Sequence, residues 1–166
     1  PRMLADGVRE AAATADLIVS TGGVSVGDED HRANVLREIG QEVISLKIAM
    51  KPGKPQVMAR IGAALAIGLP GNPVSAMVCG HVFVAPVVRA MLGLPAQPTP
   101  RLSAPLAEPL DAKGPREHYM RARFTPNGLV AFGAQDSSLL SILSAADALL
   151  VRMPKDGSRT KGDIVD

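Results

Sequence analysis

The sequence contains little that could form a disulfide, a metal cluster or a base-stacking surface. It has one cysteine, no tryptophan, one tyrosine and three phenylalanines. A single cysteine forms no intramolecular disulfide and no Cys/His cluster of the kind that holds structural zinc. So few aromatics do not form a surface on which nucleic-acid bases stack. The formal net charge is +2, from 18 basic and 16 acidic residues, so we expect no nucleic-acid partner.

Long apolar runs and a secretory leader pattern are also missing. The longest strongly apolar run, 82–88, contains Pro86 and is too short to span a bilayer, so we expect no membrane partner. No basic segment followed by an apolar one opens the chain, and we expect a cytoplasmic protein. The chain begins at Pro1 inside a helical pattern, which indicates a piece of a longer protein.

The remaining composition is typical of a globular protein of one or two domains. Hydrophobic residues make up 46% of the 166 positions, and 16 glycines and 14 prolines separate the apolar segments. Hydrophobic spacing predicts helices over 3–14, 31–39 and 74–92, the last with a kink near Pro86, and strands over 17–19, 43–48, 56–60 and 64–68. This alternation predicts an α/β domain over residues 1–95 with a largely parallel sheet.

A proline-rich stretch over 94–100 predicts a linker, and the pattern changes after it. Short strands are predicted over 101–107, 117–124, 128–132, 147–153 and 162–165, with one short helix over 139–144. Asn127-Gly128 is a strong hairpin signal. Residues 96–166 are therefore predicted to form a small β-barrel or sandwich domain.

A glycine-rich loop follows the first predicted strand. Gly22 and Gly23 let backbone N–H groups approach an anion closely, and Ser25 adds a hydroxyl. The three adjacent carboxylates at 28–30 are oxygen ligands of the type that holds Mg²⁺ beside a phosphate. The alternative is an ordinary strand-to-helix turn with Asp30 as the N-cap, and both interpretations stay open on the residues alone.

Two further loops contain candidate anion ligands. In the loop over 51–55, prolines and a glycine stiffen a turn that could aim Lys51 and Lys54 at one anion, although a solvated turn is the alternative. In the loop over 68–75, Asn72 has N-cap chemistry and Pro73 suits the first helical position. A capped core helix would not need the preceding Pro70 and Gly71, which favours an anion site at this helix start.

A fourth candidate lies in the C-terminal part. Arg121 and Arg123 leave the same face of a predicted strand, and a turn over 135–138 adds hydroxyl groups. Exposed strand charge is the commoner explanation of such a pair. His118 and the other two histidines are isolated in sequence, and Cys79 is expected to be a small core residue.

Taken in order, three of these motifs are more specific than each one alone. The motifs are, in chain order, T-G-G-V-S-V-G with a following Asp, M-K-P-G-K-P and G-L-P-G-N-P-V-S. Together they closely resemble the molybdopterin molybdenumtransferase family, which includes the E domain of gephyrin. The resemblance implies a three-layer α/β/α molybdopterin-binding domain, N-terminally incomplete here, followed by a small C-terminal β-barrel domain.

The resemblance also implies an activity. The family takes adenylylated molybdopterin and molybdate, inserts molybdenum at the dithiolene with the assistance of Mg²⁺, and releases AMP. Carried over residue by residue, it implies a pterin and metal loop of Gly22, Gly23, Ser25 and Asp30, loop lysines Lys51 and Lys54, a third loop of Pro70, Pro73 and Ser75, and a molybdate site that includes Arg121 and Ser137. Asp30, Lys51 and Lys54 would be catalytic, and Asp30 would bind the metal.

The resemblance further implies upstream domains in the same chain and a homodimer whose site is completed across subunits. Two alternatives remain open: a module that binds molybdopterin without catalysis, and an interaction scaffold of the same fold. The presence of Asp30, Lys51, Lys54 and Ser75 favours the enzyme over the scaffold.

Overall fold

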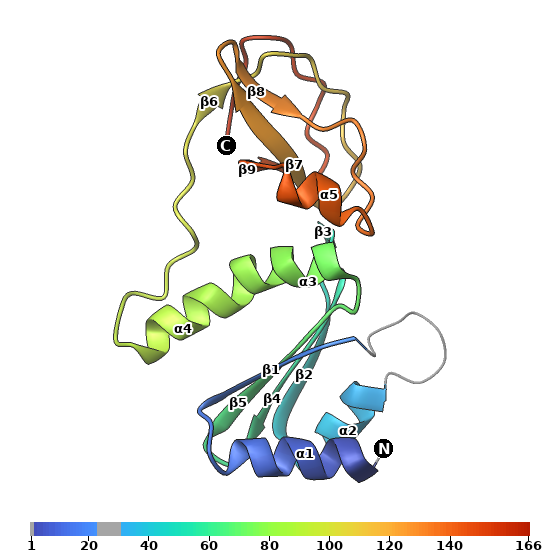
Figure 1. Cartoon of the computed structure of the whole chain (residues 1–166), viewed down its shortest axis with the longest axis vertical. Helices are drawn as coiled ribbons and strands as arrows, with labels where there is room; N and C mark the ends of the chain where they lie inside the picture. Colours follow the sequence, from blue (N-terminus) through green and yellow to red (C-terminus); the bar gives the residue numbers. More distant parts are fainter. Residues whose placement is uncertain (1, 23–30) are drawn as a thin grey trace. The chain divides into compact units, whose positions relative to one another are not determined.

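The computed structural model describes residues 2–22 and 31–166 (Figure 1). The chain divides into two compact units. The first unit comprises Pro1–Ile48 and Gly53–Gly80, and the second comprises Ala49–Pro52 and His81–Asp166. The boundary expected near residue 95 from the proline-rich stretch stays a prediction.

The first unit is a mixed sheet with helices. Its elements are α1 (Arg2–Ala12), β1 (Leu17–Thr21), α2 (His31–Ile39), β2 (Gln41–Lys47), β4 (Pro55–Ile61), β5 (Ala64–Leu69) and α3 (Pro73–Cys79). The four strands lie in the order β1-β5-β4-β2. The α/β fold class predicted for this part of the chain is confirmed.

The expectation of a largely parallel sheet is wrong. Among the described strands of this unit only β1 and β5 pair in parallel, while β4 is antiparallel to both β5 and β2. For β4 and β5 the reason is the tight turn formed by Gly62, with φ +61°, and Ala63, after which Ala64 pairs with Ile61. A two-residue turn returns the chain antiparallel, because a parallel neighbour needs a long crossover.

Apolar side chains from helices and sheet form the core of the first unit. Helices α1 and α2 cover one face of the sheet, with Leu36 packed among Val57, Ala59 and Ala66 (Figure 1). Strand residues of opposite parity point to opposite faces. Leu69 therefore leaves the other face of β5, where it lies beside Gly80 at the end of α3.

The helix predicted over 74–92 is present as three consecutive segments, α3, the π-helical η1 (Gly80–Val84) and α4 (Ala85–Met91). The irregular segment lies directly before Pro86, which has no N–H to donate to the carbonyl four residues earlier. By length and composition alone, Pro73–Met91 could cross a membrane. Core helices of soluble proteins share this composition, and Val74, Val78 and Cys79 are buried within the first unit.

The second unit is mostly strands. Its remaining elements are β3 (Met50–Lys51), β6 (Ala104–Pro105), β7 (Glu117–Thr125), β8 (Gly128–Ala131), α5 (Leu140–Ser144), β9 (Ala148–Arg152) and β10 (Ile164–Val165). The long strand β7 pairs with β3, β8 and β9, and β10 pairs with β6. The hairpin predicted at Asn127-Gly128 is confirmed, since Thr125 pairs with Gly128.

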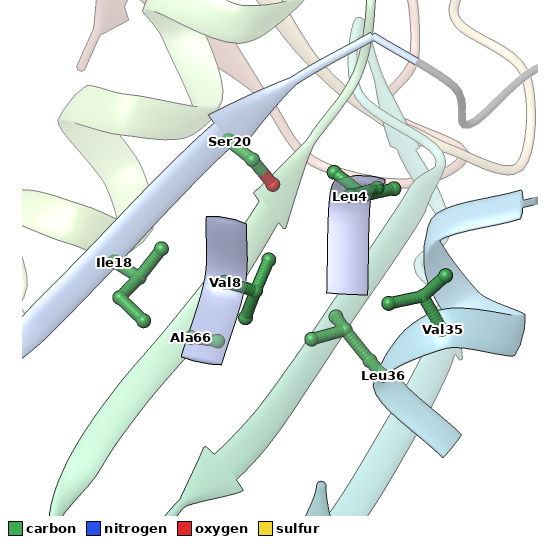
Figure 2. Close-up of a pocket in the computed structure, with 7 residues that line it drawn as sticks. All are labelled: Leu4, Val8, Ile18, Ser20, Val35, Leu36 and Ala66. Carbon is green, nitrogen blue, oxygen red and sulfur yellow. The ribbon is translucent and has the colours of Figure 1, made fainter. Parts of the chain in front are cut away.

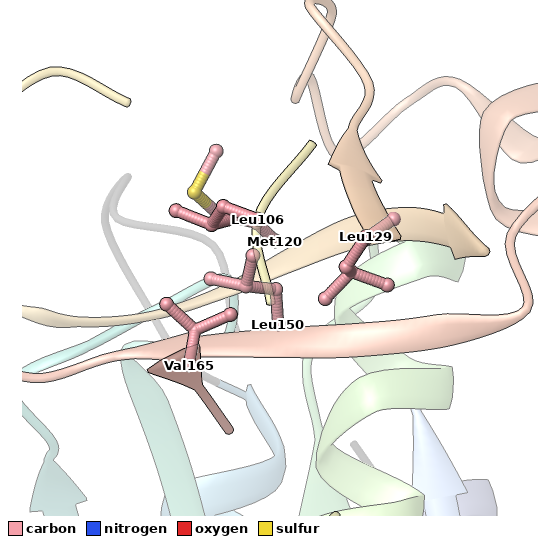
Figure 3. Close-up of a cluster of buried hydrophobic side chains, with 6 residues drawn as sticks. Leu106, Met120, Leu129, Leu150 and Val165 are labelled. Atoms are coloured by element: carbon pink, nitrogen blue, oxygen red, sulfur yellow. The ribbon is translucent and has the colours of Figure 1, made fainter. Parts of the chain in front are cut away.

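One apolar cluster holds these strands together (Figure 3). Its buried members are Leu106, Met120, Ala122, Leu129, Leu150 and Val165. Met120 and Ala122 alternate with Tyr119 and Arg121 along β7, so the apolar residues share one face of the strand. The side chain of Arg121 leaves the opposite face.

Candidate functional site

In the first unit, one edge of the sheet gathers the predicted loops. Because β1 and β5 are parallel, their carboxyl ends, Thr21 and Leu69, are paired neighbours. Strand β4 runs antiparallel to β5, so β4 begins at this same edge, directly after Lys54. Ligands of open α/β sheets bind beyond the carboxyl ends of strands.

The first and third loops touch through their glycines. Gly22 adopts φ +85°, which strongly favours glycine. A Cβ built on Gly71 would lie 2.8 Å from the Gly22 Cα, closer than real Cβ contacts allow. Both positions therefore require glycine, and the reason is close approach of two backbones rather than helix capping.

The start of α3 differs from its prediction. Asn72 occupies the N-cap position, with its carbonyl accepting the Ala76 N–H at 2.8 Å, but its side chain forms no capping hydrogen bond. The Asn72 Oδ1 is buried and finds no hydrogen-bond partner among the described residues. Pro70 and Ser75 are buried, while Pro73 is exposed at the first turn. The first-turn N–H groups of α3 are thus not used by the cap side chain.

The two predicted lysines belong to different units. Lys51 lies in β3 of the second unit and Lys54 precedes β4 of the first unit, and both side chains are exposed. Gly53, with φ +108°, makes the turn between them. Gln56, which was not a sequence candidate, is buried behind this turn and donates a hydrogen bond to the Gly53 carbonyl at 3.1 Å. The signal in the sequence that could have identified Gln56 is a polar residue at an inward position of an apolar strand.

In the second unit, Arg121 is buried completely, with 0% of its surface exposed. Its guanidinium donates to two carbonyls, of Asp136 at 3.2 Å and of Tyr119 at 3.5 Å, and its Nε has no partner within the described part of the chain. Burial lowers the pKa of Arg121, and the negative charge of Asp136 opposes this shift. The group is still cationic at neutral pH.

A second buried arginine in the same unit is compensated differently. Arg152 is 1% exposed, and its Nε donates to the Asp156 carboxylate. The same carboxylate accepts from Arg159 at 2.8 Å. Among the described residues, Arg121 has no such salt bridge to a carboxylate. A buried charge without a counter-charge is costly, so the Arg121 environment favours an anion.

The turn over 135–138 is fastened to Arg121 through Gln135. The Gln135 Oε1 accepts the Arg121 N–H at 2.9 Å, and its Nε2 donates to the carbonyls of Arg121 at 2.9 Å and Phe132 at 2.7 Å. These bonds fix where the half-buried Ser137 lies along β7. Gln135 is a second residue that was not a sequence candidate. Its hydrogen bonds to Arg121 join residues 14 positions apart in the chain, so they become visible only in the folded protein.

Positive charge surrounds this turn. The Asp136 carboxylate accepts from the Ser138 hydroxyl at 2.6 Å and the Ser138 N–H at 2.7 Å. These two hydrogen bonds, followed by the charges of Arg121 and Lys51, hold the pKa of Asp136 below its usual value. Arg123 is exposed, as the favoured interpretation of exposed strand charge expects, and lies over the Phe132 ring, 5.6 Å from its centroid. For Arg121 that interpretation is wrong, because its side chain is buried.

His118 lies at the β3 end of β7, opposite Lys51 in the pairing. Its side chain is buried, and its Nε2 has no hydrogen-bond partner in the portion that the structure describes. Burial, then the charges of Lys51, Lys113, Arg121 and Arg116, lowers its pKa to about 4. The imidazole is therefore neutral at neutral pH, in strongly cationic surroundings.

The remaining predicted site residues, Gly23, Ser25 and Asp30, lie outside the described residues. Within residues 2–22 and 31–166, no group of three or more His, Cys, Asp or Glu side chains is placed to hold a metal ion. The expected carboxylates at 28–30 lie outside these residues, so Mg²⁺ binding at Asp30 stays a prediction.

The small pocket between α1, α2 and the sheet is apolar (Figure 2). It is lined by Leu4, Val8, Ile18, Ser20, Val35, Leu36 and Ala66. Only Ser20 adds a polar side chain, so this pocket belongs to the hydrophobic core and is not a site for a charged ligand.

Two known protein families match this chain, one over each part of the sequence. Residues 1–90 match the family described as "Probable molybdopterin binding domain". The chain belongs to this family. Residues 103–166 match a second family, the "MoeA C-terminal region (domain IV)". The two matches cover the α/β part and the strand-rich part in turn.

Individual relatives agree with this assignment. The chain is 34% identical to a molybdopterin molybdenumtransferase of Nostoc over 100% of its own length and 35% of the relative's. It is also 34% identical to a protein of the same name from Haemophilus influenzae, over 93% of this chain and 40% of the relative. The chain thus spans well under half the length of these curated relatives.

Solved structures share the fold. A molybdopterin biosynthesis MoeA protein from Pyrococcus horikoshii superposes with a TM-score of 0.76 at 24% identity, covering 98% of this chain and 39% of that protein. A molybdenum cofactor biosynthesis protein from Pyrococcus furiosus gives 0.70 at 17% identity, covering 99% and 52%. These likenesses concern the fold alone.

Proposed function

We propose that this chain forms part of a cytoplasmic enzyme that inserts molybdenum from molybdate into adenylylated molybdopterin and releases AMP. The observation that carries the proposal is Arg121, a completely buried guanidinium whose described surroundings supply two carbonyls but no carboxylate salt bridge. Molybdate, a dianion with four acceptor oxygens, would supply the missing negative charge.

In this proposal, residues of the second unit bind molybdate. Arg121 would donate from its guanidinium, Ser137 from its hydroxyl, and Lys51 would add a positive charge. The dense positive charge around His118 supports an anionic substrate here. Gln135 would hold the turn with Ser137 against β7, because it bonds both backbone groups of Arg121.

Residues of the first unit would bind the pterin nucleotide. The backbones of Gly22 and Gly71 meet at the sheet edge, and a Cβ added at Gly22 would have nothing within 4 Å, so a phosphate group could approach the N–H donors there. Pro70, Pro73 and Ser75 would shape the start of α3, and Lys54 would neutralise phosphate charge. Gly23, Ser25 and Asp30 would complete the loop, with Asp30 directing water to the phosphoanhydride.

The substrates, and Mg²⁺ held by Asp30, would supply the metal chemistry when bound. The chain's own residues would orient the two anions, screen their mutual repulsion and hold the attacking water. Since the curated relatives are more than twice as long as this chain, we propose that catalysis also requires upstream domains. The homodimer implied by the family resemblance is part of the same proposal.

The test adds molybdate to the protein, expressed from its complete reading frame, after loading with adenylylated molybdopterin. Molybdate-dependent AMP release is the expected result. Binding of the adenylylated pterin without molybdate-dependent release would contradict catalysis and favour a non-catalytic binding module.

A further inference from the structure

Gln56 is a polar residue in an apolar position. It is the second residue of β4 and is 2% exposed, next to the buried Val57. Its Oε1 has no hydrogen-bond partner among the residues that the structure describes. A methionine of similar length would fill this space without burying an unpaired carbonyl. Packing alone therefore does not account for an amide here.

The amide nitrogen shows what the side chain does. The Gln56 Nε2 donates to the Gly53 carbonyl at 3.1 Å and to the Cys79 Sγ at 3.0 Å. The next carbonyl, that of Lys54, accepts the Ile48 N–H at 2.8 Å. Two consecutive peptide groups are thus held from two sides, directly at the residue that presents the exposed Lys54 ammonium.

We propose that Gln56 is a positioning residue, which fixes the Gly53–Lys54 peptide so that Lys54 presents its charge to the anionic substrate. The inference rests on the proposed function for the identity of that substrate. Gly53 adopts φ +108°, a conformation open to glycine, and glycine is free to leave it unless its carbonyl is held. Holding it in advance lowers the entropy lost when an anion binds.

The contact with Cys79 contributes much less to this role. Burial raises the pKa of the Cys79 thiol to about 11, so the sulfur is uncharged and accepts hydrogen bonds weakly. The thiol in turn donates a long, weak hydrogen bond to the same Gly53 carbonyl at 4.0 Å. Cys79→Ala therefore removes a buried neighbour of Gln56 and leaves the Gln56–Gly53 hydrogen bond, which makes it a matched control.

The experiment compares Gln56→Met and Cys79→Ala with the wild type, each expressed from the complete reading frame. One neutral hydrogen bond corresponds to about 3- to 10-fold in binding. Gln56→Met is expected to raise the KM for adenylylated molybdopterin by about this factor, with kcat changed less than about twofold. Cys79→Ala is expected to leave the KM unchanged, even if it lowers Tm.

A second readout does not depend on activity. The Ile48 amide is protected by the Lys54 carbonyl, so Gln56→Met is expected to speed its hydrogen exchange about 3- to 10-fold, and Cys79→Ala is not. Unchanged Ile48 exchange in Gln56→Met would overturn the inference whether or not the wild type releases AMP. An unchanged KM, or one that rises equally in both variants, would overturn it as well. If the wild type itself releases no AMP, only the proposed function is contradicted.

Discussion

At the sheet edge of the first unit the candidate site consists of main chain, whereas in the second unit it consists of buried side chains. Gly22 and Gly71 bring two loops together with no charge removed from water. Arg121 is buried without a salt bridge to a described carboxylate, His118 is buried amid positive charge, and both have polar atoms without partners in the described chain. The first arrangement depends on geometry and the second on electrostatics. We therefore expect substitutions at these two glycines to act on shape and those at Arg121 to act on anion affinity.

The largest expected effect belongs to the first unit's loop. Asp30→Ala is expected to lower molybdate-dependent AMP release by about 10²–10⁴-fold, because it removes the carboxylate proposed to direct water. Thermal unfolding should stay close to that of the wild type. Asp16→Ala, which removes an exposed carboxylate of the same unit, is the control. AMP release at the wild-type rate from Asp30→Ala would contradict the assigned role.

Arg121→Met is expected to weaken molybdate binding by about 10- to 100-fold, the scale of hydrogen bonds to a charged group. Stability should be unchanged or higher, since the buried charge lacks a carboxylate partner and an apolar side chain of similar length replaces it. Arg152→Met is the contrasting variant, because it breaks a salt bridge to Asp156 and should destabilise the protein by about 3 kcal/mol. Calorimetric titration with molybdate and urea unfolding measure the two effects. Equal destabilisation by both variants would refute the distinction between the two arginines.

Gly71→Ala is expected to destabilise the protein by about 1–3 kcal/mol, since its Cβ would lie 2.8 Å from the Gly22 Cα and one loop must move. Binding of adenylylated molybdopterin should weaken in parallel. Gly7→Ala in α1, where no atom lies within 4 Å of the added Cβ, should instead stabilise by about 0.5–1 kcal/mol. Urea unfolding of both variants gives the comparison, and a neutral Gly71→Ala would show that the loops do not need their close contact.

The smallest expected effect is a pH dependence in the second unit. The pKa of His118 is about 4 in the folded protein and 6.5 as the ordinary value, so the unfolded chain binds more protons between these limits. Stability is therefore retained above pH 6.5 and lost as the pH falls toward 4. From pH 7 to pH 5 the loss is expected to be about 1–2 kcal/mol. His118→Phe should remove this slope from urea unfolding, and a slope that persists would assign it to other groups.

Most helices and strands were predicted correctly because their signals, hydrophobic spacing and turn residues, lie within the element itself. The helix over 31–39 coincides with α2, the predicted strands over 56–60 and 64–68 lie within β4 and β5, and Asn127-Gly128 marks the hairpin. The direction of β4 and β5 was predicted wrongly. The alternation of helices and strands indicated a parallel sheet, whereas the short turn at Gly62 makes these two strands antiparallel. The two-residue β3 was not predicted, because its pairing with β7 joins residues far apart in sequence.

Some residues of the candidate site could also be predicted from the sequence, and others could not. Gly22, Lys54 and Ser75 were identified because they lie in short, ordered motifs. The roles of Gln56 and Gln135 depend on which carbonyls the fold brings to their amides. The polar residue in an apolar strand marks Gln56 in the sequence, but the sequence does not show which carbonyl either amide contacts. The burial of Arg121 is hidden for the same reason, since charge in a strand is ordinarily exposed.

The short strand β3 also determines how the protein can be dissected genetically. Because Ala49–Pro52 belongs to the second unit, the chain passes between units after Ile48, Pro52 and Gly80. A fragment beginning near residue 96 would lack the partner of Glu117 and His118 and would expose an unpaired strand edge that promotes aggregation. Chimeras with homologous proteins must therefore exchange residues 49–52 together with 81–166, so recombination at the proline-rich stretch would divide one structural unit.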